Sequence, residues 1–291
     1  MTRPAPLRSE DLRSEEPDLI RHAAVLGSPI AHSLSPVLHR AAYTALGLTD
    51  WTYDAHDVDE ASLPDFLSGL DASWAGLSLT MPLKRAVIPL LDEVSATARA
   101  VEAVNTVLFA ADGSRTGTNT DVPGLVNALA ERAVTEAASA AVLGAGATAS
   151  SALSALSGIA KSEVEVFIRN RARDAEIHAI AEAVGTPIRI RDWKDAPAAF
   201  EHELVISTTP TGATDDLAQA VPPTPGTLFD VLYHPWPTPL AAAWTAHGGA
   251  VLGGLDLLVH QAVLQVELMT GRAPAPLAAM RVAGEAALSA R

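Results

Sequence analysis

The stretch AAVLGAGATA, residues 140–149, has the pattern of a short buried strand that runs directly into a helix. Its first four residues are apolar, Gly144 permits a tight turn, and the small Ala149 lets the helix pack closely on the strand. Gly146 leaves room for a phosphate group to approach backbone amides at the helix N-terminus, where negative charge is favoured. The stretch therefore predicts a dinucleotide-binding turn in an α/β fold, with an ordinary tight turn as the alternative.

Arginines follow the next expected strand, residues 164–168, in the run RNRAR at residues 169–173. A site for NAD usually has Asp or Glu at this point to bind the ribose hydroxyls, whereas a planar guanidinium suits a 2′-phosphate. We therefore predict NADP(H) as the cofactor; solvated arginines at a helix start are the alternative. The cofactor-binding residues predicted from these two segments are Gly144, Ala145, Gly146, Ala147, Thr148, Arg169, Asn170 and Arg171.

The composition narrows the possible classes of protein. A chain of 291 residues with 48% hydrophobic content can bury a large core, and its formal net charge of −14 disfavours nucleic acid as a partner. It has no cysteine, which excludes disulfides and thiolate metal sites and is typical of a reducing cytosol. No segment has the roughly 18 uninterrupted apolar residues of a transmembrane helix. We expect a cytoplasmic protein that does not bind membranes.

Short apolar runs alternate with Ala-rich segments of helical spacing, a pattern typical of parallel α/β units. The expected strands are residues 23–27, 51–55, 76–79, 104–109, 139–143, 164–168, 204–207 and 227–231. A long helical run at 255–270 is expected to return to the first domain. We predict a two-domain α/β fold, with a flexible tail at 1–20, a substrate-binding and catalytic domain at 21–125, a Rossmann-like NADP-binding domain at 126–255, and C-terminal helices at 256–291.

Two serines mark a candidate anion site near the N-terminus, in the segment Ser33-Leu34-Ser35-Pro36. Ser35 has the residue type of a helix N-cap and Pro36 that of a first helical residue. Both hydroxyls would then lie beside unpaired helix amides that attract an anion. Capping alone would explain Ser35 but would not require Ser33.

Lys84 and Asp121 are the candidate catalytic residues, because each lies in a hydroxyl-rich turn that opens a helix, GLSLTMPLK at 76–84 and GTNTD at 117–121. A lysine in the first turn of a helix is unfavourably placed relative to the helix dipole, and a nearby carboxylate could tune it for proton transfer. The alternative is that Lys84 extends into solvent beside Arg85 while Asp121 caps its helix. Polar loops that precede a dinucleotide loop indicate a small polyol or keto acid facing a nicotinamide.

The chain resembles the shikimate dehydrogenases in a series of spaced motifs from about residue 22 to 283. The longest is VLGSPIAHSLSPVLH at 25–39. The others are Thr-x-Pro-x-Lys at 80–84, AVNT at 103–106, NTD at 119–121, the glycine loop at 144, STTP at 207–210, DVLY at 230–233 with TPL at 238–240, and GLDLLVHQA at 254–262. The resemblance implies NADPH-linked, reversible reduction of 3-dehydroshikimate to shikimate, a step toward the aromatic amino acids.

The resemblance also implies a role for each matched residue. Lys84 would be the general acid/base, assisted by Asp121, in a cleft between two α/β domains. Ser33 and Ser35 would hold the substrate carboxylate, and Thr80, Asn105, Asp121, Tyr233 and Gln261 would surround its ring. Thr208, Val231 and Gly254 would join the cofactor-binding residues.

Three departures from the family pattern leave alternatives open. Ser78 stands where many members have Asn, which could alter substrate choice; Gly146-Ala147 replaces a common Gly-Gly pair; and Asn170-Arg171-Ala172 replaces Asn-Arg-Thr. The alternatives are a quinate/shikimate or aminoshikimate dehydrogenase using NAD or NADP, and a non-catalytic NADPH-binding regulator. The histidines lack metal-ligand spacing, so we expect no metal. We expect a monomer or a homodimer.

Overall fold

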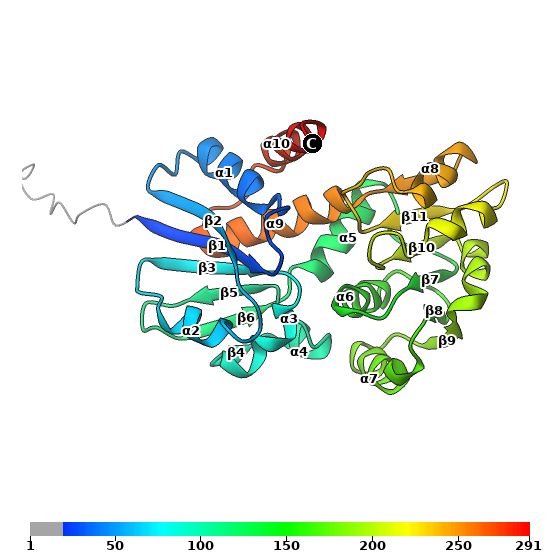
Figure 1. Ribbon diagram of the computed structural model, residues 1–291, viewed down its shortest axis with the longest axis horizontal. Coiled ribbons are helices and arrows are strands. Elements are labelled where there is room, and N and C mark those ends of the chain that lie inside the picture. Colours follow the sequence, from blue (N-terminus) through cyan, green and yellow to red (C-terminus); the bar gives the residue numbers. More distant parts are fainter. Residues whose placement is uncertain (1–19) are drawn as a thin grey trace, which may run out of the picture.

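A computed structural model describes residues 20–291 and contains two six-stranded sheets that lie side by side (Figure 1). The tail predicted at residues 1–20 lies outside the described residues, except for Ile20. The first sheet is built from residues 21–118 and the second from residues 140–252. The mixed α/β class predicted from the alternating pattern is therefore confirmed.

The first sheet has the strand order β2-β1-β3-β5-β6-β4. Its strands are β1 (Arg21–Gly27), β2 (Trp51–Asp57), β3 (Trp74–Leu79), β4 (Glu93–Val94), β5 (Thr106–Phe109) and β6 (Arg115–Thr118). The sequence pattern predicted parallel α/β units, and this sheet is instead mixed, because β5 runs antiparallel to both β3 and β6. Residues 110–114 are too few to cross back over the sheet, so β5 and β6 form a hairpin.

The second sheet is parallel throughout, with the order β12-β11-β10-β7-β8-β9. Its strands are β7 (Ala140–Leu143), β8 (Val164–Ile168), β9 (Ile188–Asp192), β10 (Leu204–Ser207), β11 (Thr227–Asp230) and β12 (Ala250–Leu252). Numbered from β7, this is the 3-2-1-4-5-6 order of the doubly wound dinucleotide fold. The order reverses between β7 and β10, and the glycine loop follows β7 at that point.

Helices cover both sheets, and the C-terminal helices lie against the first one. The helices of the first half are α1 (Ser35–Leu46), α2 (Leu63–Ser68), α3 (Leu83–Ala86), α4 (Ala96–Ala100) and α5 (Asp121–Glu131). The second half contributes α6 (Ala147–Leu156), α7 (Asp174–Val184) and α8 (Pro239–Ala246), followed by α9 (Gly254–Thr270) and α10 (Leu277–Ser289). Helix α9 packs against α1, α5, β3 and β5, and α10 packs against α1 and α9 (Figure 1).

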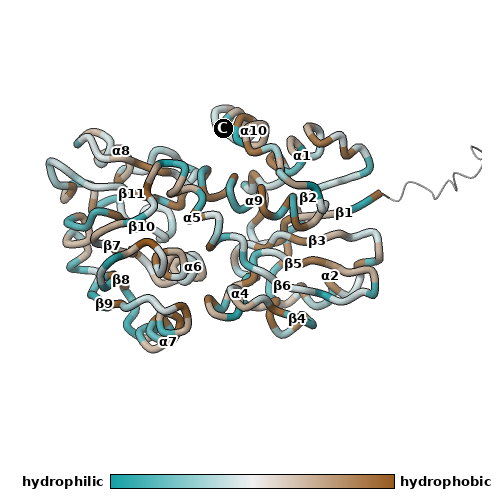
Figure 2. The backbone as a smooth tube through the Cα atoms, turned by 180° about the vertical axis from the view of Figure 1, so that it is seen from behind, coloured by the Kyte–Doolittle hydropathy of each residue, from teal (hydrophilic) through white to brown (hydrophobic). Residues whose placement is uncertain are grey.

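Buried apolar side chains form separate cores in the two halves. One core lies under α2 and α3 against β1 and β3, and two others lie on opposite faces of the second sheet. Figure 2 shows hydrophobic segments in the interior of both halves. Because the central strands β7 and β10 are buried on both faces, they read as nearly continuous apolar runs in the sequence.

Candidate functional site

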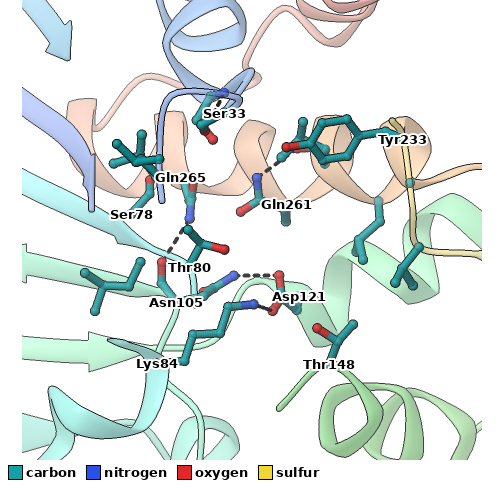
Figure 3. A pocket seen from close by; sticks show the side chains of 18 of the residues that line it. Ser33, Ser78, Thr80, Lys84, Asn105, Asp121, Thr148, Tyr233, Gln261 and Gln265 are labelled. Atoms are coloured by element: carbon teal, nitrogen blue, oxygen red, sulfur yellow. Dashed lines mark hydrogen bonds and ion pairs between the residues drawn. The ribbon is translucent and has the colours of Figure 1, made fainter. Parts of the chain in front are cut away.

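A pocket of about 170 Å³ lies between the two halves (Figure 3). From the first half, its lining includes Ser33, Ser35, Ser78, Thr80, Lys84, Asn105 and Asp121. From the second half and α9 it includes Thr148, Val231, Tyr233, Gly254, Gln261 and Gln265. Strands β1, β3, β7 and β11 all end toward this pocket, and ligands of open α/β sheets bind beyond such strand ends. All the substrate-site residues proposed from the sequence therefore line one cavity.

Lys84 and Asp121 meet in this pocket. Lys84 Nζ donates to Asp121 Oδ2 at 2.6 Å, and the side chains are 15% and 7% exposed, respectively. Lys84 lies on the one-turn helix α3, and Asp121 is the first residue of α5. The pair joins residues 37 positions apart, so Lys84 does not extend into solvent and Asp121 is not occupied with capping alone. An amine held this close to a carboxylate at the wall of a cavity is arranged for proton transfer.

Asn105 holds the other oxygen of this carboxylate. Its Nδ2 donates to Asp121 Oδ1 at 2.8 Å, while its Oδ1 accepts from the backbone N–H of Thr120 at 2.8 Å. The turn before α5 is further tied down by Asn119, whose Nδ2 donates to the carbonyl of Ala103 at 2.9 Å. All these polar groups except the Lys84 side chain are buried, so the carboxylate is held in one orientation.

The serine pair differs in detail from its prediction. Helix α1 begins at Ser35 rather than Pro36, and its N-cap is Leu34, which makes no side-chain hydrogen bond. Ser33 Oγ accepts from the backbone N–H of Ser35 at 3.3 Å. The prediction that Ser35 caps this helix was therefore wrong: Ser33 satisfies the free amide, because the helix starts one residue earlier. Both serines face the pocket.

Gln261 and Tyr233 close the side of the pocket opposite Lys84 (Figure 3). Gln261 Nε2 donates to the carbonyl of Leu258 at 2.8 Å, and Gln261 Oε1 lies 3.4 Å from the hydroxyl of Thr120. Burial raises the pKa of the Tyr233 phenol, so it stays protonated and can donate. The strand end before Tyr233 is fixed by Asp230, whose buried carboxylate accepts from Thr238 Oγ1 at 2.7 Å.

The glycine loop has the backbone geometry that its sequence predicts. Gly144 has φ = 111°, which favours glycine, and a Cβ there would lie 2.6 Å from Thr208 Oγ1. Thr208 in turn donates to the carbonyl of Leu143 at 2.9 Å. A Cβ at Gly146 would meet no atom within 4 Å, so the N-terminus of α6 opens onto free space. Among the cofactor residues proposed from sequence, only Thr148, Val231 and Gly254 line the pocket itself.

The arginine run lies beyond the end of β8. The Arg169 guanidinium lies over the Trp193 ring, 5.6 Å from its centroid. Arg171 is half exposed and forms ion pairs of 3.3 Å with Asp174 and 3.5 Å with Asp192. Asn170 Oδ1 accepts from the backbone N–H of Ala172 at 3.0 Å. Both arginines are thus near the strand end where a ribose would lie, and Arg171 is shared with two carboxylates.

Arg173, which belongs to the same arginine run, holds the glycine loop in place. Its Nη1 donates to the carbonyl of Ala145 at 2.6 Å, which ties the start of α7 to the turn after β7. The sequence singled out the run for its charge but assigned Arg173 no contact. Its place, four residues past Arg169 in the RNRAR run, was the only local signal.

Sequence reasoning missed Gln265 as a pocket residue. It is 1% exposed and lines the cavity one helical turn beyond Gln261 on α9. Residues four apart on a helix share a face, and this spacing could have found it. Ser78, singled out for its departure from the family pattern, is its neighbour: Ser78 Oγ donates to Gln265 Oε1 at 2.8 Å.

Within residues 20–291, no group of three or more His, Asp or Glu side chains is arranged to hold a metal ion. In the same span, no helix combines the length and the apolar character needed to cross a membrane.

Comparison with known proteins places these features in one family. Residues 25–107 match the shikimate dehydrogenase substrate binding domain, and residues 254–283 match the shikimate 5'-dehydrogenase C-terminal domain. The shikimate dehydrogenase (NADP(+)) of Oleidesulfovibrio alaskensis is 37% identical over 85% of this chain and 89% of its own.

Solved structures agree with the sequence comparison. The crystal structure of Mycobacterium tuberculosis shikimate dehydrogenase is similar with a TM-score of 0.84 and 40% identity, covering 91% of this chain and 99% of its own. That of the Thermus thermophilus enzyme in complex with NADP(H) and shikimate has a TM-score of 0.80 and 34% identity, covering 92% and 99%.

Proposed function

Because this chain belongs to the shikimate dehydrogenase family, we propose that its pocket interconverts 3-dehydroshikimate and shikimate with NADP(H), a step toward the aromatic amino acids. One observation carries the assignment of residues: a lysine and a carboxylate 2.6 Å apart lie in the same small cavity as the paired serines. A regulator that only sensed the nucleotide would need no such pair.

Lys84 moves the proton in this reaction. Reduction of the 3-keto group adds a hydride to carbon and a proton to oxygen, and NADPH supplies the hydride when bound. The Lys84 ammonium donates the proton to the reacting oxygen, and in the reverse direction the neutral amine accepts it. Asp121 keeps the amine at the cavity wall through the 2.6 Å contact.

The remaining lining residues hold the ring. Ser33 and Ser35 lie at the start of α1, where hydroxyls and free helix amides suit the substrate carboxylate. Thr80, Asn105 and Gln261 present hydroxyl and amide groups to the ring hydroxyls, and Tyr233 donates from the side of the second half. Polar groups that converge on a small cavity favour a small, highly hydroxylated ligand.

The residues around the second sheet fit NADP(H). Gly144 and Gly146 leave the α6 N-terminus open for the pyrophosphate, and Arg169 and Arg171 lie at the end of β8 for the 2′-phosphate. Gly254 has no room for a side chain, since a Cβ would lie 2.1 Å from the carbonyl of Val231. That close approach keeps the wall beside Thr148 flat enough for a nicotinamide ring.

The test is a purified-protein assay of shikimate and quinate oxidation with NADP and with NAD. We expect the highest kcat/KM with shikimate and NADP. A preference for quinate would assign the pocket to a different ring, and Ser78 would be the first residue to change. Absence of turnover with all four combinations, in a protein that still binds NADPH, would instead support a non-catalytic role.

A further inference from the structure

A buried chain of hydrogen bonds connects the interior of the first half to the catalytic carboxylate. Tyr53 Oη donates to Ser78 Oγ at 2.6 Å, Ser78 Oγ to Gln265 Oε1 at 2.8 Å, and Gln265 Nε2 to Thr106 Oγ1 at 2.9 Å. Thr106 Oγ1 then donates to Asn105 Oδ1 at 2.9 Å. Asn105 Nδ2 completes the chain by donating to Asp121 Oδ1, and Figure 3 shows its inner end.

The shortest contacts assign a donor and an acceptor to each hydrogen bond of this chain, and the Thr106 hydroxyl has one further contact, at 3.4 Å to Thr120 Oγ1. Gln265 Nε2 also donates to the carbonyl of Asn105 at 3.2 Å, so its amide orientation is set and Oε1 must face Ser78. Because an amide oxygen only accepts, Ser78 must donate to it and must itself accept from Tyr53. Likewise Thr106 accepts from Gln265 and donates to Asn105. All the donors therefore point toward Asp121.

The chain is shielded from solvent, and three of its members, Ser78, Gln265 and Asn105, also line the pocket. Tyr53, Ser78, Gln265, Thr106 and Asn105 are each at most 3% exposed. Burial of this many polar groups is destabilising unless each is paired, and hydrogen bonds in a directed chain polarise one another. Both donors and the oxygen of the Gln265 amide are occupied by protein partners, so this side chain has no hydrogen left for a substrate.

The Tyr53 end of the hydrogen-bond chain stays uncharged. The His39 ring stacks on Tyr53 with centroids 3.8 Å apart, and its Nε2 lies 3.4 Å from Gln265 Oε1. Burial lowers the pKa of His39 to about 3 and raises that of the Tyr53 phenol. The Tyr53 hydroxyl therefore remains a hydrogen-bond donor, and the neutral His39 ring places no positive charge beside the chain.

We propose that Gln265, Ser78 and Tyr53 are positioning residues that act through Thr106 and Asn105 to hold Asp121, and with it Lys84, in the arrangement needed for proton transfer. This rests on the proposed function of Lys84 and Asp121. The three residues lie on α9, β3 and β2, so the chain also makes the geometry of the catalytic pair depend on the packing of α9 against the first sheet.

The experiment is a steady-state comparison of Gln265→Met, Ser78→Ala and Tyr53→Phe with the wild-type protein, using shikimate and NADP. We expect Gln265→Met to lower kcat about tenfold with KM for shikimate within about threefold, since it removes hydrogen bonds that order the catalytic pair and the Gln265 amide has no free N–H to give the substrate. Ser78→Ala and Tyr53→Phe should have progressively smaller effects. The double variant Gln265→Met/Ser78→Ala should be no slower than Gln265→Met alone, because both cut the same chain.

Val266→Ala is the matched control, because Val266 is buried on the same helix but lies outside the chain. It should lower the melting temperature without changing kcat. The proposal is wrong if Gln265→Met raises KM alone, if the two losses simply add, or if Val266→Ala lowers kcat as much. Ser78→Ala and Tyr53→Phe, the smaller changes, carry the test if Gln265→Met does not fold.

Lys84→Ala separates the failure of this proposal from failure of the proposed function. A slow Lys84→Ala with a fast Gln265→Met would overturn the positioning role alone. A fast Lys84→Ala would overturn both.

Discussion

The first-sheet side of the pocket and the arginine run beyond β8 are held in different ways. On the first-sheet side, buried polar groups are paired across long stretches of chain, as with Lys84 and Asp121 or with Gln265 and Thr106, which are 159 residues apart. At the end of β8, the ion pair of Arg171 with Asp174 joins residues three apart, and the Arg171 side chain is 50% exposed. The first-sheet side is thus held by buried contacts, whereas the arginine run is held by more exposed ones, which include the pair of Arg171 with Asp192.

The difference fits the roles proposed for the two regions. Proton transfer requires an amine and a carboxylate fixed within hydrogen-bond distance, and a buried network supplies that order. A phosphate needs free backbone amides and mobile cations, which a helix N-terminus and exposed arginines supply without burial.

Lys84→Ala should lower kcat by roughly two to four orders of magnitude while KM stays within several fold, because a general acid/base acts on the transition state more than on substrate binding. Steady-state kinetics in both directions measures this. Arg85→Ala, which removes the neighbouring cation on α3, is the control and should keep most of the turnover. A Lys84→Ala variant with near-native kcat would show that Lys84 takes no part in proton transfer.

The Arg169→Ala/Arg171→Ala variant should weaken NADPH binding roughly 10- to 100-fold and NADH binding far less, because only NADPH carries the 2′-phosphate that a guanidinium fork binds. Fluorescence titration with both cofactors gives the ratio. Arg189→Ala on β9 is the matched control, since Arg189 is an exposed, ion-paired arginine of the same sheet. Equal losses for the two cofactors would mean that these arginines are simply solvated and do not contact the 2′-phosphate.

Gly144→Ala and Gly146→Ala should separate backbone strain from ligand contact. Gly144→Ala should cost about 1–3 kcal/mol of unfolding free energy, because a Cβ at φ = 111° would lie 2.6 Å from Thr208 Oγ1. Gly146→Ala should change stability by less than about 0.5 kcal/mol, since nothing lies within 4 Å, and yet weaken NADPH binding. Urea unfolding and cofactor titration of both variants decide the point. A Gly146→Ala variant with normal affinity would show that the open space is not used.

His39→Phe should remove part of the acid sensitivity of the first-sheet side. His39 stays neutral when folded because burial lowers its pKa to about 3, while the unfolded chain takes up the proton near pH 6.5. Its contribution to stability is therefore complete above pH 6.5 and is lost as the pH falls toward 3. The wild-type protein should be about 1.4 kcal/mol less stable at pH 5.5 than at neutral pH through this residue. Melting temperatures at pH 7.5 and 5.5 should show a smaller drop for His39→Phe, and identical drops would contradict the linkage.

The signals that predicted four strands of the second half are local, while β9 and β12 were not expected. The apolar runs at residues 164–168 and 204–207 coincide with β8 and β10, and Gly144 adopts the positive φ that its turn requires. The first half was predicted less well: β4, α4 and β6 were not expected, and the hairpin of β5 and β6 makes its sheet mixed. Short strands of two to four residues, partly exposed, carry too little periodicity to be recognised.

The sequence by itself determined the α/β class, the glycine turn with its arginine run, and most of the polar residues that line the pocket, because each is encoded in a few consecutive side chains and their backbone preferences. Only the tertiary structure decided that Lys84 and Asp121 are joined at 2.6 Å and that Gln265 lies behind Asn105. It also decided that the hydroxyl of Ser33, rather than that of Ser35, accepts a backbone N–H at the start of α1. Those outcomes depend on how α9 packs against β3 and β5. Such packing balances buried apolar area against the pairing of every buried polar group, and that balance is a property of the whole fold.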